Sequence, residues 1–397
     1  MDCLSLIGRE ETLFDIDISS LSKELTDVVS NSSFLVLGGA GTIGQAVVKE
    51  IFKRLPKKLY VVDLSENNLV ELVRDIRSSY GYIGGDFRTF ALDIGSLEFE
   101  AFLNSSGEYD YVLNLSALKH VRSEKDPYTL MRMVVTNVLN TKRNILQCAK
   151  KGVTKYFCVS TDKAADPVNL MGASKRMMEL FLMSLSSKIK ISTARFANVA
   201  FSDGSLLHGF KQRIDKRQPI AAPDDIKRYF INEQESGELC LMSCIFGNNG
   251  DIFFPKNNDN RLQLISFADI AQKYLKSLGF EPYLCESENE ARELADSLID
   301  NGKWPCFFSG TNTFGEKIFE EFYSQGEDVD LSKFDAIGVV KNASSFYNQE
   351  ALQYFEDSIE SLRSKGVWTE QDVLDVFVDT LPNFRHIQAK KSLDEKM

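Results

Sequence analysis

The 397-residue sequence has little cysteine, very little histidine and no long apolar run. Its seven cysteines are odd in number and scattered, which is typical of reduced thiols and not of a disulfide framework. Only His120, His208 and His386 could join Cys240 and Cys244 in a metal site, so we expect no metal. No stretch approaches the roughly 20 apolar residues of a membrane span, and the first residues lack a signal pattern. We therefore expect a cytoplasmic protein without a membrane span.

Positive charge is also scarce. Lysine and arginine number 46 against 57 aspartates and glutamates, which gives a formal net charge of −11. A protein that binds the phosphate backbone of a nucleic acid needs a basic face, so this balance argues against a nucleic-acid partner. An anionic small-molecule substrate would have to be held by a few local cations.

Short apolar runs alternate with segments of helical spacing over the first half of the chain. Strands are predicted at 33–37, 58–62, 89–93, 109–115, 155–160 and 191–196, and helices at 44–55, 66–78, 97–103, 131–151 and 171–187. This alternation predicts an α/β protein with a Rossmann-like, doubly wound parallel sheet and helices on both faces.

Composition suggests four regions. We expect an N-terminal arm over residues 1–30, an NAD(P)-binding Rossmann domain over 31–200, a smaller substrate-binding region over 201–285 with return segments to the sheet, and a C-terminal extension over 286–397. The arm mixes apolar and acidic residues, so it is expected to pack on the body or on a partner. The extension is expected to be helical at 286–300 and 348–378.

A glycine-rich turn joins the first predicted strand to the first helix. Gly38 would allow the tight turn, Gly41 would let a pyrophosphate approach the backbone, and Gly44 would let the helix pack on the strand. Asp63 follows the second strand about 20 residues later, where a carboxylate can accept both ribose hydroxyls. Because Asp63 would repel a 2′-phosphate, we expect NAD, with NADP as the alternative. A purely structural glycine turn is the competing interpretation.

Further cofactor contacts are predicted at the carboxyl ends of the strands, where ligands of such sheets bind. They are assigned to Thr42, Ile43, Asp93, Ile94 and Ser116. Asp93 and Ile94 fit an adenine contact, although an aspartate at a strand end can equally cap a helix.

Met171 and Lys175 lie one turn apart on a predicted helix, so both project from one face. This is the position of the Tyr-x-x-x-Lys pair of short-chain dehydrogenases, with methionine in place of tyrosine. A thioether cannot remove a proton, so Thr161 or Asp162 would have to take a substrate hydroxyl proton. Lys175 is expected to hydrogen-bond the nicotinamide ribose. Taken alone, the pair also fits an ordinary amphipathic helix.

At this point the sequence resembles a known family, the UDP-N-acetylglucosamine 4,6-dehydratases of the polysaccharide-biosynthesis group, within the extended short-chain dehydrogenase/reductase superfamily. The matching elements are Ala117–Val121, Ser160–Arg176, Arg195–Ser205 and Lys227–Glu235. The sequence departs from the family pattern at Leu37, Leu115, Ser116 and Arg122. These departures bear on the fit of the substrate more than on the reaction.

The resemblance implies a reaction in which sugar C4 is oxidised, water is eliminated across C5 and C6, and hydride returns to C6. Elimination needs an acid for the departing C6 hydroxyl and a base for the C5 proton, and Asp162 and Lys163 offer one of each. A lysine base needs a lowered pKa, which burial and the positive charge of the cofactor favour. A polar loop without a catalytic role is the alternative for Thr161–Lys163.

Other matched residues are expected to bind the substrate, a UDP-N-acetylhexosamine. They are Lys119, His120, Asn198, Ser205 and Arg228. Lys119 and His120 would contact the sugar or order the loop, and Arg228 would bind the diphosphate bidentately. Methionine-bearing members of the family are associated with retention of configuration at C5, so Met171 favours a configuration-retaining dehydratase.

Two rival interpretations stay open. A nucleotide-sugar 4-epimerase or reductase can use the same fold but needs no acid/base pair for dehydration. A cofactor-binding structural or regulatory protein is suggested by the missing tyrosine, although Asp162, Lys163 and Lys175 are present. We also expect a homo-oligomer whose subunit contact uses one helix face, unless that face packs inside its own chain. This 177–182 face consists of Met177, Met178, Phe181 and Leu182.

Overall fold

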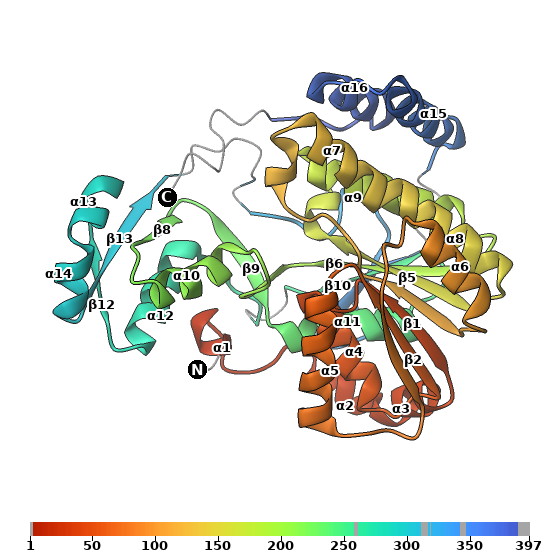
Figure 1. The fold of residues 1–397 in the computed structure, drawn as a ribbon, viewed down its shortest axis with the longest axis horizontal. Helices are drawn as coiled ribbons and strands as arrows, with labels where there is room; N and C mark the ends of the chain where they lie inside the picture. The colour runs from red at the N-terminus through yellow and green to blue at the C-terminus, as the bar shows by residue number, and fades with distance from the viewer. Residues whose placement is uncertain (1–2, 258–260, 311–316, 318, 342–346, 388–397) are drawn as a thin grey trace.

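A nine-stranded sheet forms the centre of the molecule in the computed structural model, which describes residues 3–257, 261–310, 317, 319–341 and 347–387 (Figure 1). Its strands, in spatial order, are β14 (Val329–Asp330), β15 (Ile337–Val340), β10 (Asp251–Pro255), β6 (Lys190–Phe196), β5 (Lys155–Thr161), β4 (Tyr111–Asn114), β1 (Ser33–Leu37), β2 (Lys58–Asp63) and β3 (Asp86–Ala91). The run from β10 to β3 is parallel, and β15 is antiparallel to both of its neighbours.

The strand order confirms the predicted doubly wound fold. The chain builds β1, β2 and β3 outward in one direction and then returns to place β4 on the other side of β1. The carboxyl ends of β1 and β4 therefore flank the point where the winding reverses. Ligands of open α/β sheets bind at this point.

Helices cover both faces of the sheet. Packed on one face are α4 (Thr42–Phe52), α5 (Glu66–Tyr80) and α11 (Glu233–Phe246), and on the other are α6 (Leu97–Ser105), α8 (Thr141–Lys150) and α9 (Leu170–Ser184). Alternate residues of β1 join the two resulting cores: Phe34 and Val36 join the first, Leu35 and Leu37 the second. This division follows from the pleat, which points successive side chains to opposite faces.

The helix predicted at 131–151 begins earlier than expected. Asp126 caps the first turn of α7 (Pro127–Val134) through the backbone amides of Tyr128 and Thr129. A π-helical segment, Val135–Asn140, then leads directly into α8. An aspartate followed by proline is a strong signal for a helix start.

A second, smaller lobe lies beside the carboxyl ends of the main sheet (Figure 1). It contains a parallel sheet of β12 (Glu281–Leu284), β13 (Lys303–Ser309) and β8 (Ile220–Pro223), with helices α1 (Cys3–Leu6), α10 (Leu206–Asp215), α12 (Phe267–Ser277), α13 (Glu288–Glu293) and α14 (Ala295–Asp300). A short sheet of β11 (Leu264–Ser266), β9 (Lys227–Ile231) and β7 (Asn198–Val199) links this lobe to the main sheet.

The N-terminal arm packs on the body of the chain, which was one of the two predicted alternatives. Arg9 forms a buried bidentate ion pair with Glu235 of α11, at 2.7 and 2.6 Å. Helices α2 (Asp15–Ser20) and α3 (Ser22–Ser30) follow, and Asp17 accepts hydrogen bonds from the backbone amides of Asp335 and Ala336. The arm is thus bound to α11 through Arg9 and to the backbone just before β15 through Asp17.

Two C-terminal helices, α15 (Gln349–Lys365) and α16 (Glu370–Thr380), cover the outer side of α7 and α9. The predicted subunit contact through the 177–182 face is therefore wrong. Met177 and Phe181 are buried against Phe355 and Phe377 of these helices, while the rest of that face packs toward the sheet. The alternative, burial within the chain, is the one observed.

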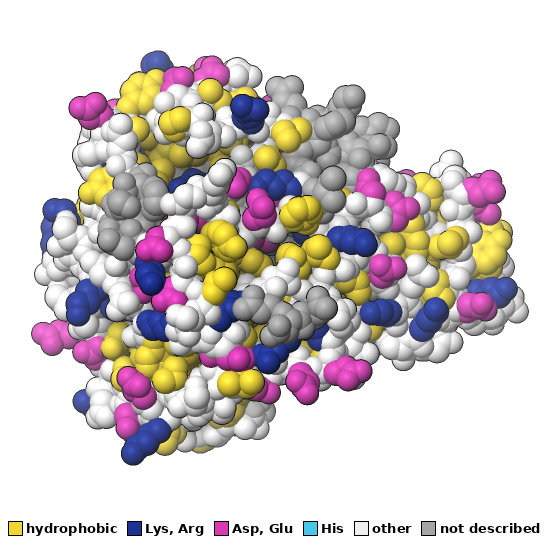
Figure 2. Space-filling view, turned by 180° about the vertical axis from the view of Figure 1, so that it is seen from behind, with side chains coloured by type: hydrophobic (Ala, Val, Ile, Leu, Met, Phe, Trp, Pro, Cys, Tyr) yellow, Lys and Arg dark blue, Asp and Glu magenta, His cyan; other side chains and the backbone are white. Residues whose placement is uncertain are grey.

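One face of the molecule is displayed with its side chains coloured by type in Figure 2. Figure 2 shows Lys and Arg side chains interspersed with Asp and Glu across the face that it displays. Among the residues that the structure describes, no helix has both the length and the apolar character needed to cross a membrane.

The C-terminal helices should contribute strongly to stability. Phe355 is fully buried, with ring centroids 6.2 Å from Phe181 and 5.1 Å from Phe377. Phe355→Ala should lower the free energy of unfolding by about 3–5 kcal/mol because it removes a buried ring and leaves a cavity. Urea denaturation measures the change. Glu360→Ala, at an exposed position of the same helix, is the control, and an equal loss in both variants would contradict the assignment.

Candidate active site

The glycine-rich turn between β1 and α4 has the geometry that the sequence predicts. Gly38 has a positive φ of 72°, and a Cβ there would come within 2.6 Å of the backbone nitrogen of Ser116. A Cβ on Gly44 would lie 2.2 Å from the carbonyl oxygen of Gly38. Both positions therefore need glycine, one for the turn and its contact with the end of β4, the other for the close approach of the helix.

The outer side of this turn is open. The nearest heavy atom to a Cβ built on Gly41 is the carbonyl oxygen of Gly38, at 3.8 Å. The amides of the first turn of α4 begin at this point, and a helix N-terminus attracts anions. Asp63 accepts hydrogen bonds of 2.9 Å from the amides of Ala40 and Ser65, so its carboxylate lies against the turn. These features fit the pyrophosphate and ribose of a dinucleotide.

Three predicted site elements meet next to the turn. Thr42 accepts a 3.0 Å hydrogen bond from the amide of Asp203, in the loop before α10. Lys119 donates to Ser202 of the same loop at 3.3 Å, and a Cβ on Gly204 would lie 2.9 Å from the His120 ring. The structure thus brings the residues after β4 and the 202–205 loop to the glycine-rich turn. Lys119 and His120 are exposed there.

The other residues predicted to bind the cofactor lie at strand ends. Ser116 follows β4, and its amide donates to Asn114 at 3.0 Å. Asp93 is exposed beyond β3 and accepts from the amide of Gly95 at 2.8 Å, whereas Ile94 is buried. Ile43 is half-buried in the first turn of α4. Their contacts with a cofactor stay predictions.

The end of β5 carries the predicted acid and base. Asp162 is 3% exposed, and its Oδ1 atom accepts from the Thr161 hydroxyl and the Lys163 amide, both at 2.8 Å. The Nζ atom of Lys163 lies 3.4 Å from the same oxygen. All these donors converge on the same oxygen of Asp162.

A second carboxylate reaches Lys163 from a segment that the sequence analysis did not select. Glu320 is 4% exposed, and its Oε1 atom lies 3.6 Å from Lys163 Nζ and 4.0 Å from Nη2 of Arg228. The predicted diphosphate ligand Arg228 is itself buried, and it donates to the carbonyls of Lys227 and Lys317 at 2.9 Å. No motif or periodicity surrounds Glu320, so no sequence signal could have found it.

Lys175 and Met171 lie deeper in the fold. Lys175 is buried and donates to the carbonyl of Val159 in β5 at 3.0 Å, and burial lowers the pKa of its ammonium. Met171 lies in the apolar cluster beneath α15 and α16, and its amide donates to Glu124 at 2.9 Å. The predicted contact of Lys175 with a nicotinamide ribose stays a prediction.

The last two predicted substrate residues lie on the link to the small lobe. Asn198 of β7 pairs with Phe230 of β9, close in sequence to Arg228. The hydroxyl of Ser205 accepts from the amide of His208 at 3.2 Å and caps α10. A hydroxyl used as a helix cap keeps a lone pair for another donor.

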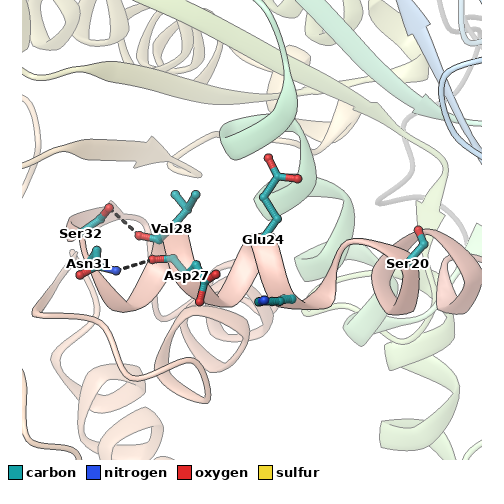
Figure 3. A pocket seen from close by; sticks show the side chains of 7 residues that line it. Ser20, Glu24, Asp27, Val28, Asn31 and Ser32 are labelled. Atoms are coloured by element: carbon teal, nitrogen blue, oxygen red, sulfur yellow. Dashed lines mark hydrogen bonds between the residues drawn. The ribbon is translucent and has the colours of Figure 1, made fainter.

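A separate surface hollow lies on α2 and α3, outside all these motifs (Figure 3). It is lined by Ser20, Lys23, Glu24, Asp27, Val28, Asn31 and Ser32. The side chains of Asn31 and Ser32 donate hydrogen bonds to the carbonyls of Asp27 and Val28 in α3. These two polar groups of the lining therefore already have partners within the chain.

Several known proteins are similar to this chain in sequence. A protein of Methanocaldococcus jannaschii called an uncharacterized membrane protein is 29% identical over 84% of this chain and 95% of its own length. The capsular polysaccharide biosynthesis protein CapD of Staphylococcus aureus is 31% identical over 81% of this chain. An inverting UDP-N-acetylglucosamine 4,6-dehydratase of Campylobacter jejuni is 27% identical over 57% of this chain and 67% of its own length. This chain spans about half of CapD, 49% of its length.

Solved structures show the same fold at lower identity. Pen from Bacillus thuringiensis has a TM-score of 0.63 at 22% identity, covering 78% of this chain and 87% of its own. DesIV, a dTDP-glucose 4,6-dehydratase from Streptomyces venezuelae, has a TM-score of 0.56 at 15% identity, covering 73% and 88%. The family model described as polysaccharide biosynthesis protein matches residues 34–342, and with this match over most of its length the chain belongs to that family.

Proposed function

We propose that this protein is a nucleotide-sugar 4,6-dehydratase that acts on UDP-N-acetylglucosamine with NAD as cofactor. The observation that carries the proposal is the pair of buried Asp162 and half-buried Lys163 at the end of β5, which Glu320 links to the cation Arg228 at the edge of the sheet that holds the glycine-rich turn. An epimerase needs no such acid/base pair. The Campylobacter jejuni dehydratases among the relatives support the same reaction.

The cofactor would supply hydride chemistry at sugar C4 and later at C6. The turn at Gly38–Gly44 and the N-terminus of α4 would hold its pyrophosphate, and Asp63 would accept the hydroxyls of the adenosine ribose. Structures of DesIV are described with NAD bound, which supports the same cofactor class here.

The chain's own residues would divide the proton transfers of the elimination. A C4 ketone acidifies the proton on C5, and Lys163 would take that proton as the base. Asp162 would protonate the departing C6 hydroxyl as the acid. Thr161 or Asp162, the nearest such groups in sequence, would take the C4 hydroxyl proton that a tyrosine would otherwise accept.

Residues at two separate places would hold the anionic substrate. Arg228 would bind the diphosphate and would give up its present contacts with the Lys317 carbonyl and Glu320. Lys119 and His120, next to the 202–205 loop, would contact the sugar or order that loop. Asn198 and Ser205 would add hydrogen bonds from the same side.

Loss of the acid or the base should abolish dehydration without preventing cofactor binding. We expect Asp162→Asn and Lys163→Met to lower the rate by about 10²- to 10⁴-fold, the usual cost of one general acid or base. Mass spectrometry of UDP-N-acetylglucosamine incubated with the protein and NAD detects the loss of one water, whereas epimerisation leaves the mass unchanged.

The controls are Asp296→Asn and Lys188→Met, at exposed positions outside the site, and both should keep the parent rate. Calorimetry should show NAD binding in all four variants. If the two site variants turn over substrate at the parent rate, Asp162 and Lys163 have no catalytic role and the loop that bears them is only structural. An unchanged mass with an epimerised sugar would favour the rival 4-epimerase.

Cofactor preference follows from the charge of Asp63. We expect NAD to bind more tightly than NADP by about tenfold or more, because a carboxylate next to a 2′-phosphate is repulsive. Asp63→Asn should narrow this difference, since it removes the charge and keeps an oxygen that can accept from the turn. Glu66→Gln, an exposed neighbouring carboxylate, should leave the difference unchanged. Tighter binding of NADP in calorimetry would overturn the NAD assignment.

The configuration at C5 is expected to be retained, because Met171 stands where the inverting branch of the family has tyrosine. The coupling constants of the C5 proton in the NMR spectrum of the product report the configuration. Met171→Tyr should keep substantial turnover because Met171 handles no proton. A product inverted at C5 would contradict the retaining assignment and leave the dehydration itself in place.

A further inference from the structure

Glu320 belongs to a segment, residues 319–328, that crosses the carboxyl ends of β5 and β6. Its backbone is anchored at several points: the carbonyl of Phe322 accepts from Arg195 at 3.0 Å, and the hydroxyl of Ser324 donates to the carbonyl of Ala165. Glu327 pairs with Arg195 at 2.7 Å. The segment is therefore fixed to β6 on one side and to the loop after Lys163 on the other.

This anchoring places the Glu320 carboxylate in a buried group of charges. Lys163 Nζ lies between two carboxylates, with Asp162 Oδ1 at 3.4 Å and Glu320 Oε1 at 3.6 Å. The charged groups that face Glu320 are Lys163, Asp162, Arg228 and Lys317. Burial raises the pKa of Glu320 and Asp162 raises it further, while Lys163 and Arg228 act in the opposite direction.

Charged groups at these distances shift one another's pKa values strongly when water is excluded. An opposite charge within about 4–6 Å typically shifts a pKa by 1–3 units toward the charged form. A second carboxylate beside an ammonium therefore stabilises its protonated form, which holds the lysine in place but keeps it from acting as a base until pH rises. The neighbour thus sets the pH at which the lysine becomes reactive.

We propose that Glu320 is a positioning residue of the site, which holds the Nζ atom of Lys163 between its own carboxylate and that of Asp162 and stabilises the ammonium form of Lys163. This inference rests on the proposed function, in which Lys163 is the base for the C5 proton. Because Glu320 is also 4.0 Å from Arg228, the same carboxylate balances the charge of Arg228 until the diphosphate takes its place.

The pH dependence of kcat/KM for dehydration tests the role of Glu320. A base must be neutral to act, so the acidic limb of the profile reports the pKa of Lys163. Glu320→Gln removes a negative charge next to Lys163, which lowers the pKa of the ammonium. The acidic limb should therefore move to lower pH, by about one unit.

Two further variants complete the experiment. Glu320→Asp keeps the charge but withdraws it by one methylene, so its limb should lie between those of the parent and Glu320→Gln. This variant carries the test if the glutamine variant does not fold. Glu321→Gln removes an exposed carboxylate from the same segment and should leave the limb unmoved.

The outcomes separate this inference from the proposed function. A limb that moves to lower pH in the order Glu, Asp, Gln supports the positioning role. A parent that dehydrates UDP-N-acetylglucosamine with a limb that neither variant moves overturns the role of Glu320 alone, even if the melting temperature falls. A parent that forms no dehydrated product overturns the proposed function and this inference with it.

Discussion

The arrangement of the site depends on one buried guanidinium, that of Arg195 in β6. It forms a bidentate pair with Glu179 of α9, at 2.9 and 2.8 Å, and a second pair with Glu327 of the 319–328 segment, at 2.7 and 2.9 Å. Burial alone would raise the pKa of Glu179, but Arg195 lowers it to about 2. Breaking a buried pair by removing one partner costs about 3–5 kcal/mol, so these three chain segments are joined firmly.

This network connects the scaffold to the chemistry. Glu179 also accepts a 2.6 Å hydrogen bond from Ser160 in β5, which directly precedes Thr161 and Asp162 in the sequence. One carboxylate therefore fixes the strand end that bears the proposed acid and base, while Glu327 fixes the segment that bears Glu320. The proposed base Lys163 lies where these two anchored pieces meet, so its surroundings are set by the buried network and not by a flexible loop.

Those parts of the fold and the site that rest on local signals could be predicted from the sequence. The glycine-rich turn was predictable because only glycine fits at Gly38 and Gly44, and Asp63 because it ends a recognisable strand. Glu320 could not be predicted, because its contact with Lys163 joins residues far apart in the sequence, and the 319–328 segment has neither motif nor periodicity. The cover of α15 and α16 on the 177–182 face was missed for a related reason. An apolar helix face indicates that something covers it, but not whether the cover belongs to the same chain.

That cover also bears on the missing tyrosine. Met171 lies beneath α15 and α16 in an apolar cluster with Phe355 and Phe377, and only 4% of it is exposed. A hydroxyl in such surroundings would need a hydrogen-bond partner to offset its desolvation, whereas a thioether does not. The Met171 position is thus built for packing, and proton transfer has to be handled elsewhere. The end of β5 is the place where the structure gathers groups for it: two buried carboxylates on either side of Lys163, one from the strand and one from the C-terminal extension.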